Sequence, residues 1–220
     1  MTAAAASASD RRVLVFRALT LAAIVCLALA FFSPIWWVSL KAPQYPADTF
    51  PDGVRIHFHM DGVKNGCEIR SNQEVFEDEA LDCVHEMNTI NHYIGMEPIE
   101  KGAVIETMLA PYLFIGMGAL LLVFMFYKGP YWWLLAVPAA ALPVGFIVDY
   151  AAWLWYFGHN LSPMGAFTVK PFMPTVFGQG KVAQFATFSY PHYGFGLMLA
   201  GSACLLLAML IRHKQLKGVA

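Results

Sequence analysis

Residues 108–127 read MLAPYLFIGMGALLLVFMFY, a run of twenty residues without a charge. The hydrocarbon core of a bilayer is about 30 Å thick, and a helix of about 20 residues crosses it. Lipid offers no partner for backbone N–H and C=O groups, so a crossing segment must satisfy them internally. The run therefore predicts a transmembrane helix. Apolar runs at residues 13–35, 131–157 and 193–211 predict three more.

The composition agrees with a membrane protein. The chain is 58% hydrophobic and only 13% charged, whereas soluble domains carry about 25% charged residues. We expect a mainly α, polytopic membrane protein with four transmembrane helices. The two outer loops, residues 36–107 and 158–192, are expected to form a small mixed cap.

The distribution of basic residues predicts the orientation. The segments on one side of the membrane carry Arg11, Arg12, Arg17, Lys128, Arg212, Lys214 and Lys217. By the positive-inside rule, both termini then face the cytoplasm. We expect residues 1–12 to be a disordered cytoplasmic segment and residues 212–220 a cytoplasmic tail. The loops would face the periplasm from a bacterial inner membrane, and the first of them holds 13 acidic and 5 basic residues.

Local patterns predict the elements of the first outer loop. Residues 54–60 alternate between apolar and polar side chains, which is typical of a half-buried strand. Asp61-Gly62 favours a hairpin turn directly after it, and Asn65-Gly66 is a competing signal. Residues 80–93 have helical character, with Gly95 as the C-terminal cap. The acidic stretch at 74–82 is read as a solvated loop or the start of that helix.

The outer loops also concentrate potential metal ligands. Imidazole and thioether groups together suit Cu(I). On a helix, His92 and Met96 would lie one turn apart, and His57 and His59 would share one face of the strand. The metal-ligand candidates are His92, Met96, His159, His59 and His57, with His85, Met87, Asp149 and Met164 as a second group.

Each candidate also has a structural interpretation, which the sequence leaves open. His57 and His59 can be the solvated face of a strand, and His85 a surface residue of a helix. His92 with Met96 can anchor a loop, and His159 can cap a helix. Methionines in loops are more often packing residues than ligands.

Two cysteines, Cys67 and Cys83, lie in the first outer loop. An oxidising compartment permits a disulfide between them, and we favour this disulfide over thiolate metal ligands. Cys26 and Cys204 lie within predicted helices, where we expect them to pack. In the third predicted helix, Pro138 and Pro143 are expected to cause a kink.

Several classes of function find no support in the sequence. It contains no GxSxG, Walker A, HExxH or Rossmann glycine motif, and no CxxCH for covalent haem. The acidic outer loop argues against binding of nucleic acid. We therefore propose no catalysis.

Four segments carry a resemblance to a known family. They are APQYP at 42–46, INHYIGM at 90–96, GHNL at 158–161 and FSYP at 188–191. Together they resemble a family of small bacterial membrane proteins associated with the gene clusters of nitrous oxide reductase, a periplasmic multicopper enzyme. The segment from Cys67 to Cys83 looks like an insertion relative to that family, so no cysteine role carries over.

The resemblance implies an accessory role. Its members would deliver copper to a periplasmic cuproenzyme or help to mature it. His92, Met96 and His159 lie in the matching motifs, and Asp149 precedes one of them. We thus expect a protein of the lipid bilayer that holds copper as Cu(I) for a periplasmic or membrane cuproenzyme.

Two other classes remain open. The first is a non-catalytic structural subunit of a larger membrane oxidase or monooxygenase, which would dock through Trp36, Tyr45, Phe172 and Tyr190. The second is a quinone-reactive subunit that handles protons through Asp149 and His159.

Overall fold

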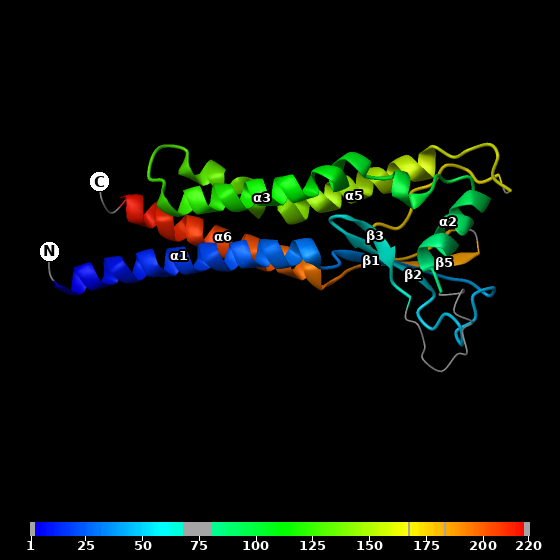
Figure 1. Cartoon of the computed structure of the whole chain (residues 1–220), viewed down its shortest axis with the longest axis horizontal. Helices are drawn as coiled ribbons and strands as arrows, with labels where there is room; N and C mark the ends of the chain where they lie inside the picture. Colours follow the sequence, from blue (N-terminus) through cyan, green and yellow to red (C-terminus); the bar gives the residue numbers. More distant parts are fainter. Residues whose placement is uncertain (1–2, 68–80, 167, 183, 218–220) are drawn as a thin grey trace. The chain divides into compact units, whose positions relative to one another are not determined.

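The computed structural model of the chain describes residues 3–67, 81–166, 168–182 and 184–217. Within them the chain is mainly helical, with a small antiparallel sheet (Figure 1). The chain divides into two compact units. The helical unit comprises Met1–Ser33, Leu109–Phe146 and Tyr193–Ala220, and the sheet unit comprises Pro34–Met108 and Ile147–His192.

Three long helices are candidates to cross a membrane. They are α1 (Ala3–Phe32), α3 (Val104–Phe126) and α6 (Tyr193–Lys217). Each holds a stretch of 23 or 24 residues in which 18 consecutive residues reach a mean hydropathy of at least 2.2. Three of the four predicted spans are therefore long and apolar enough, among the described residues, to cross a bilayer.

The fourth predicted span is not a single helix. Residues 131–157 are divided between η2 (Trp132–Leu135), α4 (Val137–Ala140) and α5 (Leu142–His159). Pro138 lies at the start of α4 and Pro143 at the start of α5. Proline lacks a backbone N–H and clashes with the preceding helical turn, but it is tolerated in a first turn. The two prolines thus begin new helices where we expected one kinked helix.

Helix α1 also begins earlier than expected. The sequence led us to expect disorder up to Arg12, whereas the helix starts at Ala3. Residues 3–6 are all alanine, and alanine has the highest helix propensity of the ordinary residues. This difference corrects the expected boundary of the N-terminal segment.

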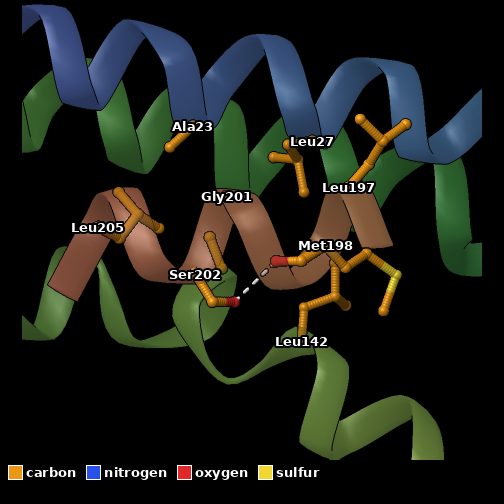
Figure 2. Close-up of a pocket in the computed structure, with 9 residues that line it drawn as sticks. Ala23, Leu27, Leu142, Leu197, Met198, Gly201, Ser202 and Leu205 are labelled. Atoms are coloured by element: carbon orange, nitrogen blue, oxygen red, sulfur yellow. Dashed lines mark hydrogen bonds between the residues drawn. The ribbon is translucent and has the colours of Figure 1, made fainter. Parts of the chain in front are cut away.

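Helices α1 and α6 pack closely through small residues. Figure 2 shows Ala23 and Leu27 on α1 facing Gly201 on α6. A Cβ at position 201 would lie 3.3 Å from Cys26 Cβ, so the glycine allows this close approach. The hydroxyl of Ser202 donates a hydrogen bond to the Met198 carbonyl at 2.9 Å, which satisfies it within the apolar surroundings.

The sheet has the strand order β3-β2-β1-β5-β4, with all neighbours antiparallel. Its central strand is β1 (Trp36–Lys41), which pairs with β2 (Val54–His59) and β5 (Phe185–Pro191). The outer strands are β3 (Gly62–Asn65) and β4 (Gly178–Val182). The predicted strand and hairpin are confirmed, since His59 pairs with Gly62 across the turn.

Helix α2 (Cys83–Tyr93) covers one face of this sheet. The carboxylate of Asp82 accepts hydrogen bonds from the N–H groups of Val84 and His85, which caps the first turn. The buried core between helix and sheet consists of Leu40, Val54, Ile56, Cys83, Met87 and Ile90. The predicted helix is confirmed over these residues, while most of the acidic stretch at 74–82 lies outside the described residues.

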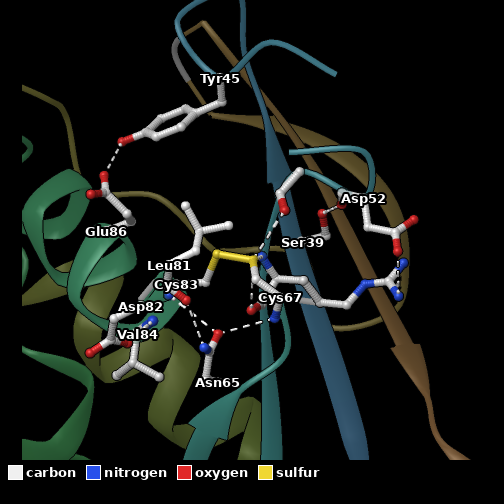
Figure 3. The surroundings of a disulfide bond; sticks show 12 residues. Ser39, Tyr45, Asp52, Asn65, Cys67, Leu81, Asp82, Cys83, Val84 and Glu86 are labelled. Atoms are coloured by element: carbon white, nitrogen blue, oxygen red, sulfur yellow. Dashed lines mark hydrogen bonds and ion pairs between the residues drawn. A yellow bond between two sulfur atoms is a disulfide. The ribbon is translucent and has the colours of Figure 1, made fainter. Parts of the chain in front are cut away.

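A disulfide joins Cys67, just after β3, to Cys83, the first residue of α2 (Figure 3). Their Cα atoms are 6.0 Å apart. The Asn65 side-chain oxygen accepts hydrogen bonds from the N–H groups of Cys67, at 3.0 Å, and Cys83, at 3.3 Å. The covalent bond and this amide together hold the start of α2 against the end of the hairpin.

Candidate metal-binding site

The sheet turns a cluster of histidines to the side opposite its core. Directly paired residues of neighbouring strands lie on the same face, and Trp37 pairs with both His57 and Tyr190. Their neighbours along the strands, such as Val38 and Ile56, belong to the core that α2 covers. The histidine face is defined by Trp37, Arg55, His57, His59, Tyr190 and His192.

Two of these histidines are in contact. The ring centroids of His57 and His192 lie 5.1 Å apart with an interplanar angle of 65°. The backbone N–H of His192 donates to the Ile35 carbonyl at 2.9 Å, which extends the pairing of β5 with β1 beyond Pro191. Residues more than 130 positions apart in the chain are thereby brought into contact.

The surroundings favour the neutral form of all three imidazoles. Burial, and to a smaller extent the charges of His192, Arg55 and His59, lower the pKa of His57 to about 4. Burial also lowers the pKa of His59 and that of His192. A metal binds only a deprotonated ring nitrogen, so these histidines are ready to act as ligands at neutral pH.

Arg55 supplies a positive charge beside the cluster. Its guanidinium carbon lies 4.6 Å from the Trp37 ring centroid, in a cation–π contact. One of its nitrogens also lies 3.2 Å from the Asp52 carboxylate. Tyr190 stacks on the same tryptophan, with ring centroids 5.2 Å apart. These contacts hold the aromatic part of the face next to the histidines.

The ring nitrogen Nδ1 of His59 is buried and has no hydrogen-bond partner among the described residues. Buried polar atoms without a partner are uncommon in folded proteins. Even so, no group of three or more His, Cys, Asp or Glu side chains stands ready to hold a metal in the part of the chain that the structure describes. The arrangement is a pair of contacting imidazoles with a third nearby.

The NHYIGM segment adopts a different geometry from the one expected. Helix α2 ends at Tyr93, and Gly95 takes a left-handed conformation with φ of +78°. Met96 therefore lies beyond the helix end, and its N–H donates to the Asn91 carbonyl at 2.8 Å. The one-turn spacing predicted for His92 and Met96 is wrong, because it required the helix to continue. The His92 side chain is exposed.

His159 is the last residue of α5 and stacks on Trp155, with ring centroids 4.6 Å apart. Its Nδ1 lies 2.9 Å from the Trp155 carbonyl oxygen. These contacts fit the helix-capping interpretation. The loop that follows it does meet the NHYIGM turn, since the Ser162 N–H donates to the Gly95 carbonyl at 2.7 Å. The backbone directly after the GHNL segment is thus bonded to the INHYIGM segment.

The second group of candidates is dispersed. His85 is exposed on α2, whereas Met87 is only 4% exposed and packs in the core of the sheet unit. Met164 is 86% exposed, and Asp149 is half-buried on α5. Burial of Met87 in an apolar core favours its packing role over a metal-ligand role.

His192 was missing from the predicted ligands. The sequence places it outside the membrane, directly before the last apolar run, but no local pattern connects it with His57. Its position depends on the pairing of β5 with β1, and we did not predict either strand. A histidine at the boundary of a predicted span was the only available signal.

Compared with known proteins, the chain matches no family model, no curated protein and no solved structure at a significant level. The resemblance to proteins of nitrous oxide reductase gene clusters therefore stays a prediction.

Proposed function

We propose that the protein is a membrane-bound accessory protein that binds copper on the histidine face, for delivery to a cuproenzyme or for its maturation. The contact between the imidazoles of His57 and His192, with His59 nearby, carries this proposal. No catalytic step is part of it.

The chemistry of the cluster supports copper. Imidazole is a favourable ligand for copper in proteins, and Cu(I) accepts as few as two nitrogen ligands. The pKa values of the three imidazoles are lowered, so protons compete only weakly with a metal for their ring nitrogens. Nδ1 of His59, which has no hydrogen-bond partner within the described ranges, offers a further donor.

Two observations support a proposal for the cellular location. Disulfides persist in oxidising compartments, which favours the periplasm for the unit with the Cys67–Cys83 bond. Apolar helices on either side of this unit in the sequence support attachment to the membrane. We propose a bacterial inner membrane with both termini in the cytoplasm, and a periplasmic or membrane cuproenzyme, such as nitrous oxide reductase, as the partner.

The structure changes our preferred ligands. His57 and His59 stay among the preferred ligands and His192 joins them, whereas His92, Met96 and His159 lose preference, because the pairing of His92 with Met96 relied on a helical spacing that is not formed. His92, Met96 and His159 remain an alternative set between the NHYIGM turn and the loop after α5. The two sets share no residue, so mutations separate them.

A competition experiment tests the proposal. The full-length protein is purified in detergent, and Cu(I) is titrated against a chromogenic chelator without oxygen. We expect stoichiometric binding that weakens at least tenfold in His57→Ala and in His192→Ala. His85→Ala is the matched control, because it removes an exposed imidazole from the same unit.

Three outcomes are informative. Loss of binding in His92→Ala and Met96→Ala alone would move the site to the NHYIGM turn. Equal binding by all variants would contradict a histidine site. No binding by folded wild-type protein would favour the structural subunit, although Trp36, at 2% exposed, could not belong to its docking surface.

A further inference from the structure

The helical unit contains a buried arginine, Arg212 on α6. This side chain is only 6% exposed. Its Nη2 donates a hydrogen bond to the Tyr127 carbonyl, and its guanidinium carbon lies 5.0 Å from the Phe16 ring centroid. Its Nε is buried and has no hydrogen-bond partner among the described residues.

Gln215 repeats the pattern one turn later on the same helix. Residues three apart share a helix face, and Nε2 of Gln215 is also buried without a hydrogen-bond partner in the described chain. Two neighbouring donors therefore lack an acceptor there. Hydrogen-bonding capacity left unused in a buried position is costly, which indicates that an acceptor other than the described residues completes the site.

The charge of this region also lacks compensation. All ion pairs found among the described residues belong to the sheet unit. They are Arg55–Asp52, Lys64–Asp61 and Lys101–Glu97. By sequence, the helical unit contains a single acidic residue, Asp10.

Other basic residues are sequence neighbours of Phe16 and Tyr127, the two residues that Arg212 contacts. The guanidinium of Arg17 lies over the Phe126 ring, 5.6 Å from its centroid. Lys128 directly follows Tyr127, whose carbonyl Arg212 binds. Positive charges on α1, on α6 and directly after α3 therefore lie at the same end of the helical unit, and we expect the missing acceptor to be an anion.

The position of Arg212 along α6 indicates its depth in a membrane. From Tyr193 to Arg212, α6 rises about 28 Å at ~1.5 Å per residue. This length is close to the thickness of a hydrocarbon core, about 30 Å. If α6 enters the bilayer at Tyr193, the guanidinium lies at the level of the lipid phosphates on the other side.

We infer that Arg212 and Gln215, with Arg17 and Lys128 beside them, bind the phosphate group of an anionic phospholipid. A phosphate offers several acceptor oxygens and pairs with a guanidinium in bidentate fashion. Basic pockets between transmembrane helices are known sites for anionic headgroups. Both donor atoms are buried, so binding of the phosphate requires a rearrangement of the half-buried Gln215 side chain.

Native mass spectrometry of the full-length protein tests this inference. Detergent-purified protein is stripped of lipid and titrated with phosphatidylglycerol, phosphatidylcholine or inorganic phosphate. We expect one phosphatidylglycerol per chain, and at least tenfold weaker binding by Arg212→Gln. Lys214→Gln is the matched control, because it removes the same charge from an exposed position on the same helix.

The arms of the experiment separate the sources of the phosphate. Displacement of the lipid by millimolar inorganic phosphate would assign the site to free phosphate, with the same residues as ligands. Equal weakening in Lys214→Gln and Arg212→Gln would overturn the inference in favour of unspecific surface attraction. Unchanged binding by Arg212→Gln would also overturn it.

If Arg212→Gln fails to fold, a second variant still tests the lipid site. Gln215→Leu removes one unsatisfied donor and keeps every charge. We expect it to weaken lipid binding severalfold while the protein remains monodisperse. Binding equal to that of the wild type in this variant, together with loss of fold in Arg212→Gln, would assign Arg212 a purely structural role. The experiment is independent of copper.

Discussion

Gly95 accepts a hydrogen bond from the Ser162 N–H at 2.7 Å, and this contact joins the turn after α2 to the loop after α5. A Cβ at position 95 would lie 2.5 Å from the Ser162 carbonyl oxygen. The glycine also has a φ of +78°, which other residues adopt only at a cost.

Substitution Gly95→Ala should therefore destabilise the sheet unit strongly. Left-handed backbone costs about 1–2 kcal/mol for a residue with a Cβ, and overpacking adds about 1–3 kcal/mol. The measurement is the thermal midpoint of detergent-purified protein. Gly62→Ala is the control, because Gly62 has a φ of +136° but a Cβ added there would have no heavy atom within 4 Å. Equal losses in both variants would mean that crowding by Ser162 contributes nothing.

Ser189 forms a buried polar junction, and its removal should be costly. Its hydroxyl accepts from Trp36 Nε1 at 2.8 Å and donates to the Val176 carbonyl at 2.8 Å. Ser189→Ala removes this acceptor and should cost about 1–3 kcal/mol. Ser162→Ala, at an exposed serine, is the control. In a double-mutant cycle, adding Trp36→Phe should cost less than the sum of the single changes; additive costs would argue against coupling.

The disulfide between Cys67 and Cys83 should make a measurable contribution to stability. It closes a loop with a sequence separation of 16, and a loop of this size corresponds to about 3 kcal/mol. We expect the double variant Cys67→Ala/Cys83→Ala to lower the thermal midpoint, and reductant to have no further effect on it. The variant Cys26→Ala/Cys204→Ala should keep the sensitivity to reductant, since both thiols are free. If reductant left the thermal midpoint of the wild-type protein unchanged, a stabilising role of the disulfide would be contradicted.

Copper binding should persist at unusually low pH. An ordinary histidine is half protonated near pH 6.5, but His57 has a pKa lowered to about 4. Because protons compete with the metal for the ring nitrogen, Cu(I) affinity should change little from pH 7 to pH 5 and fall as the pH approaches 4. The chelator competition at each pH measures this. A steep loss between pH 7 and pH 6 would instead indicate ligands with ordinary pKa values.

The same pKa predicts how stability depends on pH. The folded state disfavours the charged form of His57, so His57 contributes fully to stability only above the unfolded pKa of about 6.5. This contribution is lost as the pH falls toward about 4. Thermal midpoints should decline over that window, and His57→Gln should make the decline shallower. An unchanged slope in the variant would assign the acid sensitivity to other groups.

Local patterns in the sequence were sufficient for part of the fold. The apolar runs of α1, α3 and α6 need no partner to be recognised, because lipid itself selects them by length and polarity. The alternation from Val54 to His59 and the cap at Gly95 likewise depend on neighbouring residues only. At 131–157 the sequence predicted one helix kinked at Pro138 and Pro143, whereas these prolines lie at the starts of the separate helices α4 and α5.

The sequence alone was enough to predict helices long and apolar enough to cross a membrane and to favour the disulfide between Cys67 and Cys83, because hydrophobicity and short-range periodicity act locally. Only the tertiary structure decided which histidines meet. β1 lies between β2 and β5, and strand pairing over such distances along the chain depends on the burial of a whole sheet face. His57 and His192 are neighbours for that reason, while His92 and Met96, four residues apart, are separated by the end of a helix.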